Sequence, residues 1–189
     1  MEQPKLRRST SRKVIYAQQA LIGWLAAILV TLLLLAAVFG LWLTPVRVSG
    51  DSMQPNLLDG QVVLCDRLAR FVRTPSRGDA ILFSDPAGSG YLIKRIVGLP
   101  GETVEVNGGC VYIDGCPLDE STYVRLGLNP GLGDMGPVTV PEGRVFVLGD
   151  DRSIVYDSRV SAIGTIAYAD IRGVVRLRIY PVGSLTLFG

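Results

Sequence analysis

The longest uncharged stretch of the chain lies near its N-terminus and limits what this region can fold into. No charged residue occurs in residues 14–46, and residues 20–43 are almost wholly apolar. As an α-helix the apolar segment would extend over roughly 36 Å, at about 1.5 Å per residue, which is enough to cross a bilayer core of about 30 Å. A removable signal peptide has an apolar run of only about 7–15 residues. The sequence therefore predicts a single retained transmembrane helix, at residues 17–44.

The flanks of this predicted helix differ in charge. Residues 1–16 contain five basic residues and one acidic residue, whereas Arg47 and Asp51 cancel on the other side. Because positively charged flanks stay on the cytoplasmic side, we expect the tail in the cytoplasm and residues 45–189 outside the plasma membrane. Topology and anionic membrane lipid account for the basic tail, so it gives no reason to expect a nucleic-acid partner.

Beyond the predicted helix, helical patterns almost vanish. Short runs of Val, Ile, Leu, Phe and Tyr alternate with Gly, Pro, Asn and Asp, which is typical of strands joined by tight turns. Asn107-Gly108 and Asp114-Gly115 predict hairpin turns, and residues 118–141 and 150–161 predict longer loops. The spacing favours a mainly β domain, an antiparallel barrel or sandwich. The predicted strands are residues 61–65, 80–83, 91–97, 103–106, 111–113, 144–148 and 173–180.

Three cysteines lie in the part of the chain that we expect in an environment permitting disulfides. A turn at Asp114-Gly115 would place Ile113 opposite Cys116, with Cys110 about three residues farther along its strand, which is a poor stagger for a bridge. A different turn could bring the two cysteines together, so the sequence leaves this disulfide open. Neither a CxxC pair nor a Cys/His cluster occurs, so we expect no metal site.

The chain contains no histidine, which excludes every mechanism that depends on a Ser–His or Cys–His pair. Lysine can act as a general base instead when burial lowers its pKa from about 10.4 toward neutrality. Lys94 is the only lysine outside the predicted cytoplasmic tail. The thirteen arginines outside the tail cannot act as bases. On a strand Lys94 would share a face with Leu92 and Ile96, which favours apolar surroundings over an exposed polar face.

Ser52 is the candidate nucleophile. It lies in the sequence GDSMQP, where Gly50 allows a close approach of the backbone to a substrate and Pro55 stiffens the following turn. A backbone N–H at such a bend could stabilise an oxyanion. Ser52 is only nine positions after Leu43, a reach of at most about 30 Å, so the serine would stay near the bilayer surface. On composition alone, an ordinary loop leaving the membrane would explain the same residues.

Four sequence blocks, in order, resemble those of the bacterial type I signal peptidases. The blocks are GDSMQP around Ser52, RGDAILF at residues 77–83, KRIVGLPGE from Lys94, and GDDR at residues 149–152 followed by Asp157-Ser158-Arg159. The resemblance covers the predicted helix and nearly all of residues 44–181. It implies a mainly β catalytic domain, cleavage of signal peptides after small residues in an Ala-x-Ala pattern, and no cofactor.

The resemblance also implies roles for individual residues. Ser52 would attack the scissile carbonyl, and neutral Lys94 would take its proton and return it to the leaving amine. The Ser52 backbone N–H would hold the oxyanion, while Gly50 stands where some members carry an assisting hydroxyl. The resemblance implies that four further residues support the site structurally, namely Asp150, Asp157, Ser158 and Arg159. Composition alone would instead suggest a plain surface loop there.

One position departs from the family pattern. Val155 stands where the family usually carries a serine that is thought to hydrogen-bond the lysine. Either Ser153 or Ser158 supplies this hydroxyl through a shifted loop, or Lys94 lacks the partner. The loss would lower activity rather than abolish it, as in a weakened or specialised paralogue.

Two alternatives belong to other classes. A Ser–Lys autoprotease related to the SOS-response repressors would share the dyad, but those proteins are soluble and carry a DNA-binding region. A bitopic β domain could instead bind a partner at the membrane surface without catalysis. This last alternative predicts that Ser52 and Lys94 lie far apart, whereas an enzyme needs them within hydrogen-bond reach.

Overall fold

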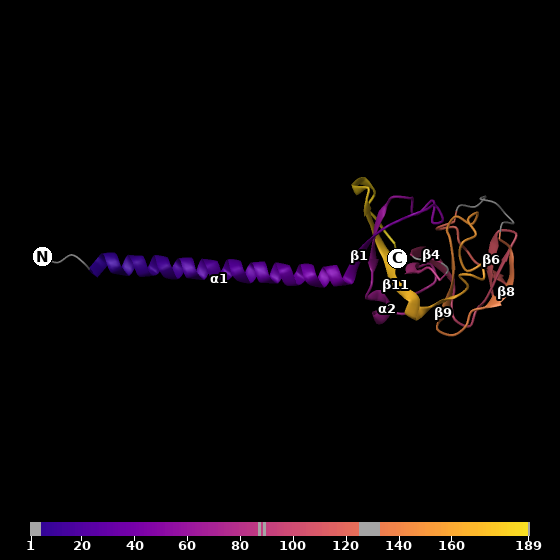
Figure 1. Cartoon of the computed structure of the whole chain (residues 1–189), viewed down its shortest axis with the longest axis horizontal. Helices are drawn as coiled ribbons and strands as arrows, with labels where there is room; N and C mark the ends of the chain where they lie inside the picture. Colours follow the sequence, from indigo (N-terminus) through magenta and orange to yellow (C-terminus); the bar gives the residue numbers. More distant parts are fainter. Residues whose placement is uncertain (1–4, 87, 89, 125–132, 189) are drawn as a thin grey trace. The chain divides into compact units, whose positions relative to one another are not determined.

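The chain forms two compact units, Met1–Trp42 and Leu43–Gly189. A computed structural model describes residues 5–86, 88, 90–124 and 133–188. In the first unit, helix α1 (Lys5–Trp42; Figure 1) contains the span Ile15–Gly40, whose mean hydropathy is 2.7. Within the described residues this is the one helix that is long and apolar enough to cross a membrane.

Helix α1 ends at Trp42, two residues before the end of the transmembrane helix predicted at residues 17–44. Leu43 and Thr44 instead begin strand β1 (Leu43–Arg47), where they pair with Asp66 and Cys65. The physical reason is Pro45, which disfavours helical geometry at the residue before it and lacks the N–H that a helix interior needs. A proline is tolerated here because β1 is an edge strand of its sheet.

The second unit is built from two antiparallel sheets, so the prediction of a mainly β domain is confirmed. Every predicted strand is present, with ends shifted by at most two residues. Among the described residues the larger sheet has the order β1, β2 (Val62–Asp66), β11 (Ile171–Tyr180), β3 (Ala80–Ser84), β4 (Tyr91–Gly98), β9 (Arg144–Leu148) and β10 (Ile166–Ala167), with β12 (Thr186–Leu187) paired to β11.

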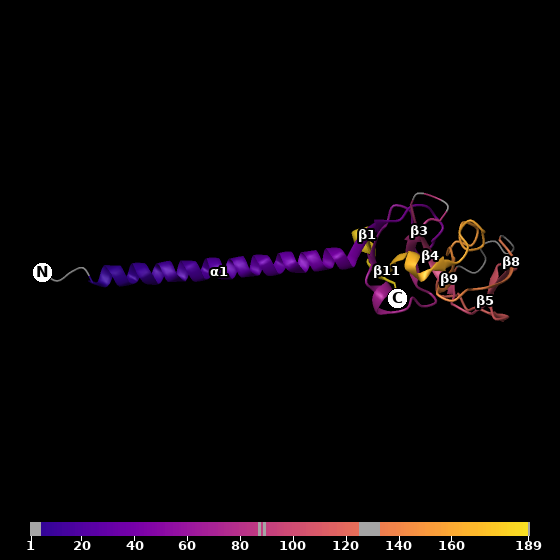
Figure 2. The same ribbon diagram turned by 60° about the horizontal axis from the view of Figure 1, so that its bottom comes forward.

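The smaller sheet lies at one end of the unit, beyond β9 (Figures 1 and 2). Its order is β7 (Cys116–Pro117), β6 (Cys110–Ile113), β5 (Thr103–Asn107) and β8 (Met135–Thr139). Short helical segments complete the described part of the unit, namely α2 (Ala69–Val72) and the 3₁₀ turns η1 (Tyr168–Asp170) and η2 (Val182–Ser184).

The two predicted hairpin turns have different outcomes. The turn at Asp114-Gly115 is confirmed, since Ile113 pairs with Cys116 and both turn residues have positive φ. The other turn lies one residue later than predicted, because Asn107 pairs with Cys110 and leaves Gly108 and Gly109 between them. A two-residue turn of this kind requires positive φ at both positions, and only the Gly-Gly pair provides it without a steric cost.

Strand β8 lies inside the segment 118–141 that the sequence predicted to be a loop. Its sequence MGPVT contains a glycine and a proline, which are typical of loops, although the segment pairs with β5. As an edge strand β8 can accommodate Pro137. The sequence left a disulfide between Cys110 and Cys116 open; on the neighbouring β6 and β7 both are free and exposed, and Cys65 is free and buried.

Apolar clusters cover both faces of β3. Alternate residues of this strand point to opposite faces, so Ile81 and Phe83 belong to one cluster and Ala80 and Leu82 to the other. A third cluster packs the smaller sheet against the ends of β4 and β9. Strand β4 pairs with β3, so its side chains also point toward one or the other of these two apolar clusters.

Candidate active site

Lys94 is buried on an apolar face of β4. Its cross-strand neighbour is Ile81, and the next residue on the same face, Leu92, lies opposite Phe83. The side chain of Lys94 is therefore surrounded as its strand position predicted, and only 1% of the residue is exposed. Burial lowers the pKa of Lys94 from 10.5 to about 8, because an ammonium group loses hydration in such a place.

Three charged residues modify this effect. Asp157 and Asp150 favour the ammonium form and raise the pKa of Lys94, whereas Arg159 lowers it. Burial outweighs all three, so Lys94 can lose its proton near neutral pH, which an ordinary lysine cannot do.

Ser52 lies in the loop that connects β1 to β2. The loop is closed at its base, where the Val48 N–H donates to the Gln61 carbonyl at 2.8 Å and the Gly60 N–H donates to the Val48 carbonyl at 3.0 Å. Next to the serine, Met53 is 2% exposed and packs into the cluster on the Leu82 face. The residue that directly follows Ser52 is thus anchored, while Ser52 itself stays half-buried.

The turn after β9 packs directly onto the backbone of Ser52. The Asp151 N–H donates to the Ser52 carbonyl oxygen at 3.1 Å. A Cβ atom on Gly149 would lie only 2.6 Å from that same oxygen, so the close approach requires glycine. The first turn of the predicted loop 150–161 therefore holds the candidate nucleophile in place.

Asp157 and Arg159 form a buried ion pair in the same loop. Asp157 is fully buried and accepts the Arg159 Nε–H at 2.9 Å and the Gly149 N–H at 3.1 Å. Arg159 also donates to the Arg152 carbonyl at 2.9 Å. Asp157 thus holds the glycine that touches Ser52, and its carboxylate is the charge that most strongly favours the ammonium form of Lys94. Ser52 therefore contacts the loop whose charges act on Lys94.

Asp150 belongs to a second ion pair, with an arginine that the sequence did not single out. Arg95 donates to the two carboxylate oxygens of Asp150 at 2.7 and 2.6 Å, and Asp150 is 1% exposed. Asn56 donates to the same carboxylate at 2.8 Å. The guanidinium of Arg95 lies 4.5 Å from the centre of the Tyr123 ring. Arg95 follows Lys94 on β4, so the alternation of side chains along a strand places it on the opposite face. This alternation is the sequence signal that could have predicted a role for Arg95.

Comparison with known proteins identifies the family. Residues 21–180 match the family described as signal peptidase, peptidase S26. The chain belongs to this family. A signal peptidase I from Bacillus amyloliquefaciens is 31% identical over 187 residues, which cover 95% of this chain and 94% of that protein. A probable signal peptidase I-1 from Synechocystis is 37% identical over 165 residues, 80% of this chain and 81% of its own.

A solved structure is also similar. A signal peptidase I from Enterococcus faecalis shares 35% sequence identity with the chain, with a TM-score of 0.46. The match covers 55% of this chain and 97% of that one.

The hydroxyl groups near Val155 can be compared with the S26 signal peptidase pattern. The Ser158 hydroxyl donates to the Gly164 carbonyl at 2.7 Å and accepts the Val147 N–H at 2.9 Å. The Ser153 hydroxyl donates to Asp151 at 2.6 Å. Among the described residues neither hydroxyl is hydrogen-bonded to Lys94, which favours a Lys94 that lacks the usual hydroxyl partner. Ser158 instead fixes the loop to β9.

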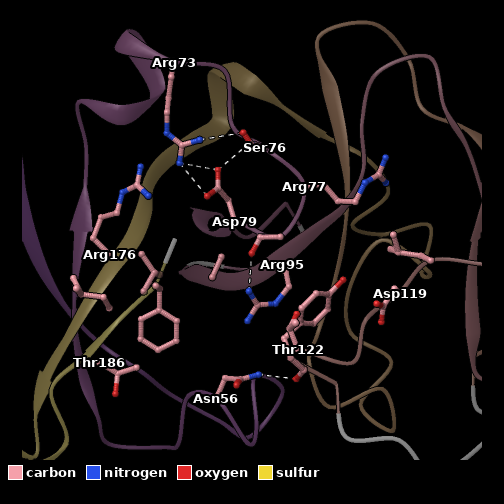
Figure 3. A pocket seen from close by; sticks show the side chains of 17 residues that line it. Asn56, Arg73, Ser76, Arg77, Asp79, Arg95, Asp119, Thr122, Arg176 and Thr186 are labelled. Atoms are coloured by element: carbon pink, nitrogen blue, oxygen red, sulfur yellow. Dashed lines mark hydrogen bonds and ion pairs between the residues drawn. The ribbon is translucent and has the colours of Figure 1, made fainter.

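A cavity of about 720 Å³ lies on the other face of β4 from Lys94 (Figure 3). Arg95, Asn56 and Tyr123 contribute to its wall, and Arg73 and Arg176 reach it from α2 and β11. Neither Ser52 nor Lys94 is among the residues that line the cavity. Among the described residues no group of three or more His, Cys, Asp or Glu side chains could hold a metal ion.

Proposed function

We propose that this chain is a membrane-bound serine endopeptidase that removes N-terminal signal peptides from exported preproteins. Membership of the S26 signal peptidase family supports the reaction and the substrate class. The observation that carries the catalytic assignment is Lys94, a fully buried lysine whose pKa is lowered to about 8. A charged lysine is costly in such a place, which suits a base and does not suit a binding domain without catalysis.

In the proposed reaction Ser52 Oγ attacks the scissile carbonyl carbon while neutral Lys94 Nζ takes the hydroxyl proton. The negative charge that develops on the carbonyl oxygen is stabilised by the Ser52 backbone N–H. When the intermediate collapses, Lys94 returns the proton to the leaving amine, and the signal peptide stays bound as an ester of Ser52. Lys94 then takes a proton from water, whose oxygen attacks the ester carbonyl. As the ester bond breaks, Lys94 returns that proton to Ser52 Oγ, and the signal peptide leaves as a carboxylic acid.

The charged residues of the loop after β9 support the site in this proposal without touching the substrate. Asp157 and Arg159 fix the backbone of the loop, Asp150 fixes Arg95, and Ser158 ties the loop to β9. No cofactor takes part. A Lys94 without the usual hydroxyl partner would suit a weakened or specialised member of the family, because nucleophile and base both remain.

We further propose that helix α1 anchors the enzyme in the plasma membrane with its N-terminus in the cytoplasm and the β domain outside. The charge of residues 1–16 supports this orientation. Membrane lipid surrounds the span Ile15–Gly40 in this proposal. The basic tail is assigned to topology and anionic lipid, so we propose no nucleic-acid partner. Ser52 is only nine positions after Leu43, so the nucleophile meets a substrate that is itself held at the lipid surface.

The pH dependence should report the Lys94 titration. We expect kcat/KM for a preprotein to rise with pH, with a midpoint at about pH 8, because only the neutral amine of Lys94 accepts the serine proton. The measurement is a set of initial rates from pH 6 to 11, with circular dichroism as the control that the protein stays folded. A profile that keeps rising to about pH 10.4 would show an ordinary solvated lysine.

Substrate specificity provides the experiment that tests the proposed function. The purified full chain in detergent is given a preprotein with an Ala-x-Ala sequence, and the new N-terminus is identified by mass spectrometry. We expect one cut, directly after the second alanine. Replacing that alanine by Phe should lower kcat/KM by about tenfold to a hundredfold, since overpacking a close-fitting pocket costs about 1–3 kcal/mol.

The middle residue of the motif supplies the matched control. Successive side chains of an extended peptide point in opposite directions, so Phe at the middle position should leave the rate nearly unchanged. Equal rates for Ala and Phe directly before the cut would reject a pocket for small residues. No cleavage at any site by the folded chain would reject the proposed function itself.

A further inference from the structure

Asn56 lies four residues after Ser52 on the same loop, and its side-chain amide has two partners. The Nδ2 group donates to the Asp150 carboxylate at 2.8 Å and to the Tyr123 carbonyl at 2.7 Å, so both of its hydrogens are used. The Asn56 carbonyl accepts a bond from Arg178 at 3.1 Å. The chain turns tightly between Met53 and Leu57, since the Leu57 N–H donates to the Met53 carbonyl at 2.8 Å.

The carboxylate that Asn56 contacts leads directly to the strand of the candidate base. Asp150 is held by two bonds from Arg95, which follows Lys94 on β4. Arg95 is itself fixed by a bond of 2.6 Å to the Gly78 carbonyl. A continuous chain of hydrogen bonds therefore joins the loop of Ser52 to the strand of Lys94, through Asn56, Asp150 and Arg95.

This chain of bonds lies on the face of β4 that is turned away from Lys94. Figure 3 shows Asn56 and Arg95 in the wall of the cavity there, with the Asn56 amide directed at the segment of Thr122 and Tyr123. Asn56 is also separate from the direct backbone contact between Asp151 and Ser52.

We propose that Asn56 is a positioning residue that fixes Ser52 relative to Lys94 through Asp150 and Arg95. This inference rests on the proposed function and deepens it. A neutral amide on the far face of β4 touches neither the substrate nor Lys94. Its loss should therefore reduce the rate of the chemical step and leave substrate binding and the protonation of Lys94 unchanged. A displacement of about 1 Å in such a site can cost about a hundredfold in rate.

The test compares Asn56→Ala and Asn56→Asp with the wild type in the preprotein assay. We expect Asn56→Ala to lower kcat by about tenfold to a hundredfold, with KM within about twofold and the midpoint of the pH profile unchanged. Asn56→Asp should lose at least as much, because its carboxylate would face the Asp150 carboxylate and the Tyr123 carbonyl. Asn107→Ala, at an exposed hairpin residue, is the matched control and should match the wild type.

Each outcome separates the inference from the proposed function on which it rests. No cleavage by the wild type overturns both. Cleavage by the wild type with an unchanged kcat in Asn56→Ala overturns the inference alone, and so does a loss confined to KM or a shifted pH midpoint. If both Asn56 variants are unfolded at the assay temperature while Asn107→Ala is folded, Asn56 serves stability only, and the inference is again overturned.

Discussion

Replacing Lys94 by methionine should abolish preprotein cleavage and, at pH 7, raise the free energy of unfolding by about 3 kcal/mol. Methionine has a similar length and fits an apolar site without charge. In the wild type the pKa of Lys94 falls from 10.5 in the unfolded chain to about 8 in the folded one. The folded protein therefore holds this proton less tightly, and keeping it at pH 7 costs stability.

The pH dependence of the stabilisation follows from the same pKa values. The cost is complete below about pH 8 and decreases between about pH 8 and 10.5, where the unfolded chain also loses the proton. The gain from Lys94→Met, measured by urea unfolding, should accordingly disappear near pH 10.5. Arg67→Met, at an exposed cation, is the control and should change stability by less than about 0.5 kcal/mol. Equal stability of Lys94→Met and wild type at pH 7 would contradict a desolvated lysine.

Replacing Ser52 by alanine should lower the cleavage rate by several orders of magnitude, about 10⁴-fold or more, because the nucleophile is lost. The fold should not change. Ser52 contacts the loop after β9 through its carbonyl oxygen, which accepts the Asp151 N–H, and alanine keeps that oxygen. Ser161→Ala, at an exposed serine outside the site, is the matched control with an expected wild-type rate. A Ser52→Ala variant that cuts at more than a tenth of the wild-type rate would exclude Ser52 as the nucleophile.

The local sequence pattern was sufficient to predict the environment of Lys94. Leu92 and Ile96 share its strand face by the period of two alone, and the pairing of Lys94 with Ile81 completes that face. The strands of the β unit were predicted to within two residues for the same reason, since each is a short run of β-branched and aromatic residues between turn residues.

Features that depend on distant partners could not be predicted in this way. Asn56 and Asp150 are 94 residues apart, and Arg95 and Asp150 are 55 residues apart, so no local pattern links them. The same holds for Gly149, whose need to be glycine comes from the carbonyl of Ser52. Strand β8 was missed because its pairing with β5 outweighs a sequence rich in turn residues.

The most direct test of the Ser–Lys dyad is the initial rate at which wild type, Ser52→Ala and Lys94→Met release the mature N-terminus of one preprotein at about pH 8. All three proteins should be folded by circular dichroism and present at equal concentration. The dyad predicts a cut after the Ala-x-Ala sequence by the wild type and only the background rate for both variants. Cleavage by a folded Lys94→Met at a rate within tenfold of the wild type would contradict it.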